Sequence, residues 1–282
     1  MRIYVTGATG FLGSWVVAKA LAEGFDVIAP RRSDHASLCI PSSLQPLWIN
    51  KDLEGLSSSD LQGVDAVIHM ASAGVSPKKA TPRELAHVNV ELTLHLASQA
   101  CEAGVRSFVV AGTCYEYGLS SNHYEFIPVD ACLRPVNVYG ASKAAAFHML
   151  YSLALRDALP LVYCRIFTAF GEGQSILNFW PSLRAAALTG RDFEMSSGMQ
   201  IRDFLPVERV AEQLLSACNR VDASNQPKVI NIGSGVPKTL KQFAEEQWQS
   251  FNAPGKLIFG AKPSRPDDLP RIVADMTGPS NG

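Results

Sequence analysis

Short apolar runs alternate with longer segments of helical spacing through the first 170 residues of the chain. The runs at 2–6, 26–30, 47–50, 66–71, 107–111 and 161–166 predict strands. The segments 11–23, 83–104 and 139–155 carry apolar residues at helical spacing and predict helices. Continuous apolar strands separated by helices are typical of a parallel sheet that is covered on both faces. The pattern therefore predicts an α/β fold with a Rossmann-type, doubly wound parallel sheet.

Beyond residue 170 the pattern changes to loops, glycines, prolines and short mixed segments. In this part a helix is predicted at 207–218 and a strand at 228–232. Neither an internal repeat nor a low-complexity linker separates the two parts. We therefore expect a sheet domain at 1–170 and a smaller C-terminal lobe at 171–282, with chain crossings between them and one shared cleft.

Composition and charge exclude several classes of protein. The net charge is −1, so the chain has no excess of positive charge for a nucleic acid. Six cysteines and six histidines show neither a C-x-x-C nor an H-E-x-x-H spacing, which argues against disulfides and a metal site. We see no apolar run of membrane-spanning length and no signal peptide before the first strand. We expect a cytoplasmic protein without a nucleic-acid or membrane partner and without a bound metal.

A glycine-rich segment, Thr6-Gly7-Ala8-Thr9-Gly10-Phe11-Leu12-Gly13, lies between the first strand and the first helix. Glycines at such a turn let the backbone approach a pyrophosphate, and the helix N-terminus offers free amides and partial positive charge. The segment follows a strand and opens a helix, which is the context that a dinucleotide site requires. The expected cofactor contacts in this loop are Gly7, Thr9, Gly10, Phe11, Leu12 and Gly13.

Two arginines follow the second strand, where an acidic residue normally binds the ribose 2′-hydroxyl of NAD. Arg31 and Arg32 stand there instead, with no acidic residue expected to oppose them. A guanidinium suits a 2′-phosphate, so the sequence favours NADP(H) over NAD(H). The alternative is that both arginines are merely solvated. Asp52 and Leu53, after the third strand, resemble the pair that borders the adenine in such folds.

Tyr139 and Lys143 are four residues apart, so they share one face of a predicted helix. A phenol is a poor acid or base at neutral pH, and an adjacent ammonium would lower its pKa. Tyrosine could then exchange a proton with a hydroxyl or carbonyl while a nicotinamide carries hydride. This spacing, downstream of the glycine loop, predicts an oxidoreductase site.

Taken together, these motifs resemble the extended short-chain dehydrogenase/reductase superfamily, in its nucleotide-sugar epimerase/dehydratase/4-ketoreductase group. The resemblance covers nearly the whole chain and includes the segments 67–71, 111–118 and 202–204. It implies that Thr113 hydrogen-bonds the reacting oxygen, that Tyr139 is the acid/base, and that Lys143 lowers the pKa of Tyr139 and holds the nicotinamide ribose. Thr113, Tyr139 and Lys143 are therefore the expected catalytic residues.

The resemblance also implies further contacts. Asn89 resembles an asparagine that shapes the central helix, and Arg202 resembles the arginine that binds the diphosphate of a nucleotide sugar. The alternative for Arg202 is a surface ion pair with Asp203 or Glu208. The remaining expected contacts are Met70, Ala71, Ser72, Tyr139, Lys143 and Ile166 for the cofactor, and Ser72, Thr113, Tyr115, Thr168, Asn178 and Arg202 for the substrate.

The residues after Thr113 bear on the reaction. In the 4,6-dehydratases of the family an Asp-Glu pair follows this threonine, whereas here Cys114 and Tyr115 do, which disfavours that elimination. Arg31 and Arg32 favour NADPH and hence reduction of the C4 ketone of a nucleotide-linked 4-keto-6-deoxyhexose. A 4-epimerase with bound NAD, a reductase of another substrate class, and a non-enzymatic dinucleotide-binding regulator stay open. By analogy with the superfamily, the helices at 83–104 and 139–155 are expected to pair in a homodimer.

Overall fold

The computed structural model describes residues 1–75, 77–221, 226–265 and 268–277. Its centre is a seven-stranded sheet in the order β10-β6-β5-β4-β1-β2-β3, in which every pair of neighbours is parallel. The strands are β1 (Arg2–Thr6), β2 (Asp26–Arg31), β3 (Leu47–Asn50), β4 (Ala66–His69), β5 (Ser107–Thr113), β6 (Leu161–Ile166) and β10 (Lys228–Ile232). The predicted Rossmann-type fold is confirmed.

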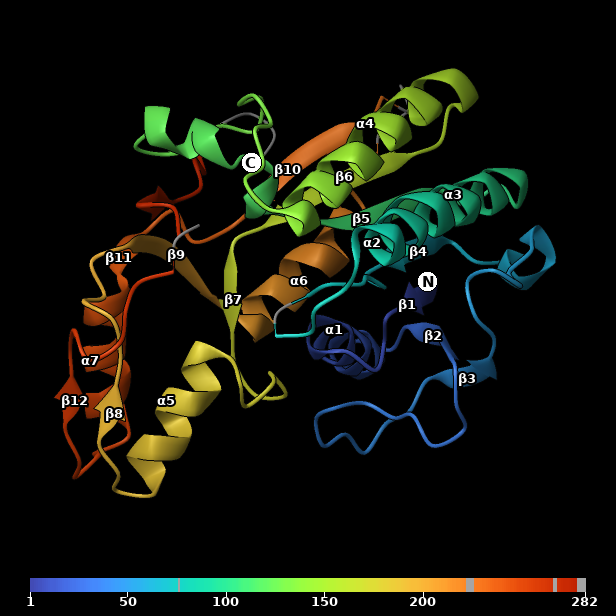
Figure 1. Ribbon diagram of the computed structural model, residues 1–282. Coiled ribbons are helices and arrows are strands. Elements are labelled where there is room, and N and C mark those ends of the chain that lie inside the picture. The colour runs from blue at the N-terminus through green and yellow to red at the C-terminus, as the bar shows by residue number, and fades with distance from the viewer. Residues whose placement is uncertain (76, 222–225, 266–267, 278–282) are drawn as a thin grey trace.

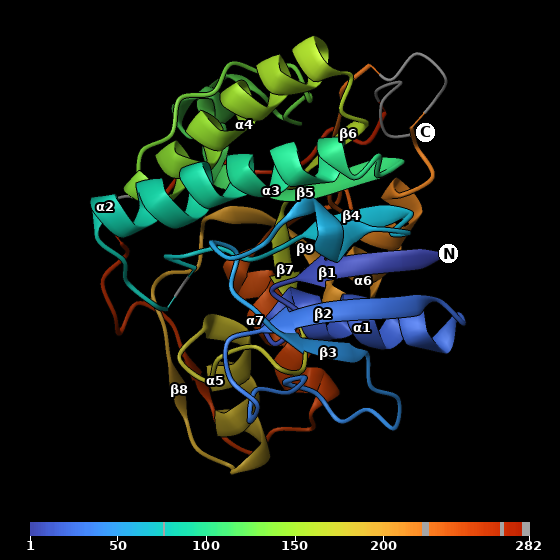
Figure 2. The ribbon, with the colours of Figure 1, turned by 90° about the vertical axis from the view of Figure 1, so that its right-hand side faces the viewer.

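Helices cover both faces of this sheet (Figures 1 and 2). On one face α1 (Phe11–Ala22) and α6 (Val207–Ala217) enclose a core that includes Val16 and Leu214. On the other face α3 (Leu92–Glu102) and α4 (Val138–Asp157) enclose a second core that includes Leu96 and Leu150. Because both faces are buried, the strands read as continuous apolar runs.

The helix predicted at 83–104 is interrupted. It consists of α2 (Pro82–Leu85), a π-helical segment η2 (Ala86–Glu91) and α3. Asn89 lies in the π-helical segment, fully buried, and bonds across to Ala73 and Ser142. A π turn of this kind re-aims one side chain within a helix, and apolar spacing does not reveal it.

Two strand ends differ from the prediction by two residues each. β4 ends at His69 rather than at residue 71, because the N–H groups of Met70 and Ala71 donate to the side-chain oxygen of Thr6. β5 continues to Thr113, two residues further than predicted. Both changes occur at the carboxyl edge of the sheet, where ligands of such folds bind.

The smaller lobe lies at the carboxyl edge of the main sheet and at one side of the molecule (Figure 1). Its aromatic core includes Phe204 and Phe243, whose stacked rings lie 3.9 Å apart, and Trp248. Its elements are β7 (Thr168–Phe170), α5 (Phe179–Leu188), β8 (Phe193–Glu194), β9 (Ile201–Pro206), β11 (Pro237–Thr239), α7 (Leu240–Ser250), β12 (Leu257–Ile258) and β13 (Arg271–Ile272). The short helices η1 (Ser58–Leu61), η3 (Cys114–Glu116) and η4 (Leu119–His123) belong to connections of the main domain.

Residues 207–232, which the sequence assigns to the smaller lobe with crossings from the sheet domain, include α6 and β10. α6 packs against α1, and β10 pairs with β6 to extend the main sheet. The helix has a marked apolar face that is buried on the main sheet through Val210 and Leu214. The chain therefore crosses to the smaller lobe, returns to the main sheet and crosses again.

Within the described residues, no helix combines the length and the apolar character that crossing a membrane would require. The same part of the chain contains no group of three or more His, Cys, Asp or Glu side chains arranged to hold a metal ion.

Candidate active site

The glycine loop has the close backbone contacts that a dinucleotide cradle needs. Gly7 has φ +70°, and a Cβ there would lie 2.7 Å from the amide nitrogen of Ala71. A Cβ on Gly13 would lie 2.0 Å from the carbonyl oxygen of Gly7. Gly10 caps α1 without a side-chain hydrogen bond, so the first-turn amides of Phe11 and Leu12 face the loop. These residues fit a bound pyrophosphate.

The segment after β4 lies directly beside this loop. Thr6 accepts hydrogen bonds from the amides of Met70 and Ala71, and its hydroxyl also contacts buried His69 at 2.7 Å. Ser72 donates to the side-chain oxygen of Asn89 at 3.0 Å. The predicted cofactor residues Met70, Ala71 and Ser72 are therefore brought next to Gly7.

Tyr139 is at the start of α4 and reaches this same segment. Its hydroxyl lies near the side chain of Ser72, which acts on the pKa of the phenol. Gly140 allows α4 to approach η3, because a Cβ there would lie 2.7 Å from the carbonyl oxygen of Tyr115. Burial raises the pKa of Tyr139 well above its ordinary value, Ser72 lowers it in part, and the charge of Glu116 raises it further.

Lys143 lies one helical turn further along α4 and is 3% exposed. Burial lowers its pKa to about 8, and the carboxylate of Glu116 opposes this effect. Its charge also contributes, after burial, to the low pKa of His69 at the end of β4. The expected lowering of the phenol pKa of Tyr139 by Lys143 stays a prediction.

Thr113 ends β5 and caps η3. Its side-chain oxygen accepts from the amide of Tyr115 at 3.4 Å, and its own amide donates to the carboxylate of Glu116 at 2.7 Å. A hydroxyl that accepts one hydrogen bond keeps its proton to donate elsewhere. Cys114 is buried, and burial raises the pKa of its thiol to about 12 while Arg202 opposes the shift.

The guanidinium of Arg31, expected to bind a 2′-phosphate, already has partners within the chain. Arg31 donates to the carboxylate of Asp34 at 3.4 Å and to Asn50 at 3.1 Å, and it lies over the ring of Trp48. An acidic residue therefore does oppose this guanidinium, three positions along the chain. Arg32 is exposed.

Arg202 in β9 is buried and donates to the carboxylate of Asp268. Neither Asp203 nor Glu208 is its partner in the structure, so that alternative is wrong; Asp203 instead binds the 234–235 turn. The charge of Arg202 lowers the pKa values of Cys114 and Tyr115, so it acts on the segment that follows β5. Sequence reasoning missed Asp268, because 66 residues separate it from Arg202 and no local spacing links them.

The other predicted contacts lie at strand ends and at the start of one helix of the smaller lobe. Ile166 ends β6, Thr168 begins β7 and Tyr115 is half-exposed beside Thr113. Asn178 precedes α5. The carboxylate of Asp52 accepts from the amide of Gly55, and Leu53 packs against the core beneath α3.

Glu116 was also missed, although a local signal marks it. A threonine three residues before a glutamate is the pattern of a capping box, and Thr113 and Glu116 form one. The carboxylate is fully buried and pairs with Arg165 at 2.9 Å.

The chain is similar to nucleotide-sugar enzymes. It is 27% identical to a UDP-glucose 4-epimerase of Azospirillum brasilense over 97% of this chain and 83% of that protein. It is also 27% identical to a dTDP-6-deoxy-L-talose 4-dehydrogenase (NAD(+)) of Aggregatibacter actinomycetemcomitans, over 95% of this chain and 97% of that protein.

A solved structure of MoeE5 in complex with UDP-glucuronic acid and NAD has the same fold. It superposes with a TM-score of 0.83 and 29% identity, covering 98% of this chain and 90% of that one. The profile of the NAD dependent epimerase/dehydratase family matches residues 3–233. The resemblance found in the sequence is thereby confirmed: the chain belongs to the NAD dependent epimerase/dehydratase family.

Proposed function

We propose that this protein catalyses oxidation and reduction at C4 of a nucleotide-linked hexose. The observation that carries the proposal is the position of Thr113, Tyr139 and Lys143 at the carboxyl edge of the sheet, beside the glycine loop. The smaller lobe, where the charge of Arg202 acts on the segment that follows β5, would bind the nucleotide diphosphate.

Each residue has a defined task in this proposal. The glycine loop and the N-terminus of α1 hold the pyrophosphate of the dinucleotide, which when bound supplies the hydride acceptor and donor. Thr113 donates its hydroxyl proton to the reacting oxygen. Tyr139 takes a proton from the C4 hydroxyl and returns it, and the Lys143 ammonium stabilises the phenolate and binds the nicotinamide ribose.

We propose 4-epimerisation with a retained NAD as the leading function. Arg31 is engaged by Asp34 and Asn50, which disfavours its use for a 2′-phosphate. The similar enzymes include several UDP-glucose 4-epimerases, and MoeE5 was solved with NAD. Cys114 stays a neutral thiol near pH 7 and cannot replace the acid of a 4,6-dehydratase.

NADPH-dependent reduction of a nucleotide-linked 4-keto-6-deoxyhexose is the second candidate. The exposed Arg32 favours it, because this side chain can turn toward a 2′-phosphate beyond the end of β2. The likeness to the 4-dehydrogenase of Aggregatibacter actinomycetemcomitans, over nearly the full length of both chains, supports it as well.

One experiment separates the two. The protein is incubated with UDP-glucose and NAD, and separately with a dTDP-4-keto-6-deoxyhexose and NADPH or NADH, with NMR of the products and absorbance at 340 nm. An epimerase forms the C4 epimer of UDP-glucose without net absorbance change, whereas a reductase consumes reduced cofactor. Absence of both reactions, with dinucleotide bound, would contradict the proposed function.

We also propose a homodimer through the outer face of α2, η2, α3 and α4. This face carries exposed apolar side chains, among them Met149 and Leu155, next to a groove lined by Arg83, His87 and Leu94. Sedimentation at micromolar concentration tests it, and Met149→Glu should yield monomers.

A further inference from the structure

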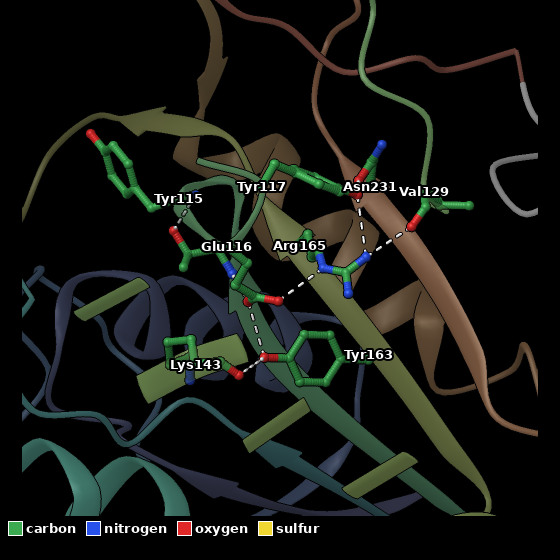
Figure 3. A network of polar contacts seen from close by, with 9 residues as sticks. Tyr115, Glu116, Tyr117, Val129, Lys143, Tyr163, Arg165 and Asn231 are labelled. Atoms are coloured by element: carbon green, nitrogen blue, oxygen red, sulfur yellow. Dashed lines mark hydrogen bonds and ion pairs between the residues drawn. The ribbon is translucent and has the colours of Figure 1, made fainter. Parts of the chain in front are cut away.

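Glu116 brings a negative charge into the protein interior, and Figure 3 shows its carboxylate beside Arg165 and Tyr163. Its side chain is inaccessible to solvent and accepts hydrogen bonds from three groups. These are the amide of Thr113 at 2.7 Å, the hydroxyl of Tyr163 at 3.0 Å and Nε of Arg165 at 2.9 Å. A buried carboxylate is costly unless it is paired and hydrogen-bonded, and here both conditions are met.

Arg165, which pairs with Glu116, is itself held by several further contacts. Arg165 in β6 also donates to the carbonyl of Val129 at 2.9 Å and to the hydroxyl of Tyr117 at 3.3 Å. Its guanidinium lies 4.3 Å from the ring centroid of Phe147 on α4. Because Arg165 is held in this way, it fixes one oxygen of Glu116 and leaves the other for Thr113 and Tyr163.

The same carboxylate is connected to Lys143 by two routes. The hydroxyl of Tyr163 lies within hydrogen-bond distance of both Glu116 and the backbone carbonyl of Lys143, at 3.1 Å from the latter. The charge of Glu116 also raises the pKa of Lys143 against the larger, lowering effect of burial. The other titratable groups near Lys143 are Tyr139 on its own helix and His69 on β4, and burial keeps His69 neutral.

Gly112 shows how closely these groups approach the strand. A Cβ at this position would lie 2.3 Å from Cε1 of Tyr163 and 2.7 Å from Oε1 of Glu116. Only a residue without a side chain lets the phenol and the carboxylate share this space beside β5.

We propose that Glu116 is a positioning residue that fixes the main chain of Thr113 and, through Tyr163, the main chain of Lys143, and that its carboxylate is the counter-charge of the Lys143 ammonium. It touches neither substrate nor cofactor in this proposal. The expected effect of Glu116 on turnover rests on the function proposed above. The expected effect of Glu116 on the titration of Lys143 does not, because it can be measured in the protein without substrate or dinucleotide.

The first test is a titration of Lys143 in the ligand-free protein. Lysine is labelled with ¹³C at Cε, and the Lys143 signal is identified by its loss in Lys143→Gln. We expect titration near pH 8 in the natural protein and at lower pH in Glu116→Gln, whose amide oxygen still accepts from Thr113. Titration at the same pH in both would overturn the proposal.

Glu116→Gln leaves the buried Arg165 without its carboxylate partner and could destabilise the fold, so a second variant is needed. The double variant Glu116→Gln/Arg165→Gln removes both members of the buried ion pair, and its Lys143 should also titrate below the natural protein. Tyr163→Phe keeps the carboxylate but removes the link to Lys143, so its Lys143 signal should titrate close to pH 8 while turnover of UDP-glucose falls several-fold. Unchanged turnover in Tyr163→Phe would contradict the positioning role.

Tyr117→Phe is the matched control, because it removes a hydroxyl that contacts Arg165 and Asn231 but not Glu116. It should leave the Lys143 titration unchanged. In the activity assay, Glu116→Gln should lose roughly tenfold in kcat/KM at pH 8 and little at pH 6. The loss at pH 8 is expected because a pKa of Lys143 that is lower by one unit reduces its protonated fraction up to about tenfold, whereas at pH 6 Lys143 stays protonated in both proteins. If Tyr139→Phe stays active, the proposed function fails; if Tyr139→Phe is inactive and the titrations coincide, only the present proposal fails.

Discussion

Arg202 donates a hydrogen bond to the carboxylate of Asp268, and this pair joins β9 to the segment before β13. The arginine side chain is 7% exposed and that of Asp268 23%, so the pair is largely shielded from solvent. Within the described residues its guanidinium donates to this carboxylate and to the carbonyl of Ile201. Its remaining N–H groups suit a diphosphate.

Replacing Arg202 should therefore weaken substrate binding. Arg202→Gln is expected to raise KM for a nucleotide sugar about 10- to 100-fold, because a charge-assisted hydrogen bond contributes roughly 1.5–3 kcal/mol. Steady-state kinetics and calorimetry with UDP measure the effect. Arg209→Gln, an exposed arginine on α6, should leave KM unchanged. An unaltered KM in Arg202→Gln would remove Arg202 from the binding site.

Tyr139→Phe removes the proposed proton carrier and keeps the ring. We expect kcat to fall by about 100-fold or more, the usual contribution of a general acid or base, while the affinity for the dinucleotide stays within about twofold. Fluorescence titration with NADH and product NMR provide both readouts. Tyr151→Phe, on the outer part of the same helix, should behave like the natural protein.

Gly13→Ala should disrupt the dinucleotide cradle. A methyl group there would lie 2.0 Å from the carbonyl oxygen of Gly7, so the loop must move. We expect dinucleotide affinity to fall at least about tenfold, as measured by calorimetry with NAD. Gly255→Ala creates comparable crowding against Arg191 in the smaller lobe and should lower thermal stability without changing this affinity.

The stability of the fold should depend on pH through His69. Burial lowers its pKa to about 3, and its two ring nitrogens contact Thr6 and Thr93. The unfolded chain binds a proton near the ordinary pKa of 6.5, whereas the folded chain does not until about pH 3. The stability that neutral His69 contributes above pH 6.5 is therefore lost as the pH falls toward 3.

Urea unfolding at a series of pH values measures this effect. In His69→Gln the slope of the unfolding free energy against pH should decrease between pH 6.5 and 4, by at most about 1.4 kcal/mol per pH unit, the value for one proton. His95→Gln, a histidine that bonds the Leu56 carbonyl at 2.8 Å, is the comparison variant. Equal slopes in His69→Gln and the natural protein would contradict the assignment.

The sheet and its first helices were predictable because burial on both faces leaves a clear apolar signal. The strands β1, β3 and β6 begin and end where the pattern predicted. The carboxyl ends of β4 and β5 were not predictable, since hydrogen bonds of Thr6 and Glu116 decide them rather than apolar spacing. The π-helical segment around Asn89 depends in the same way on distant partners.

The site was predictable as far as local motifs reach. The glycine loop and the Tyr139–Lys143 spacing are short-range patterns that the fold preserves. The acidic partners of Arg202 and Arg165 come from 66 and 49 residues away. Pairings at such separation follow from topology, which one sequence does not reveal. Asp34, by contrast, stands three positions after Arg31, and its pairing was overlooked.

The position of β10 has a consequence for dissecting this protein. A fragment that ends at residue 170 would lack both α6 and β10, leaving β6 as an uncovered edge and the apolar face that α1 and α6 share only partly covered. Unpaired edges and exposed apolar faces promote aggregation. The two lobes are thus interwoven by the chain path, and neither can be produced as an autonomous unit by a single cut.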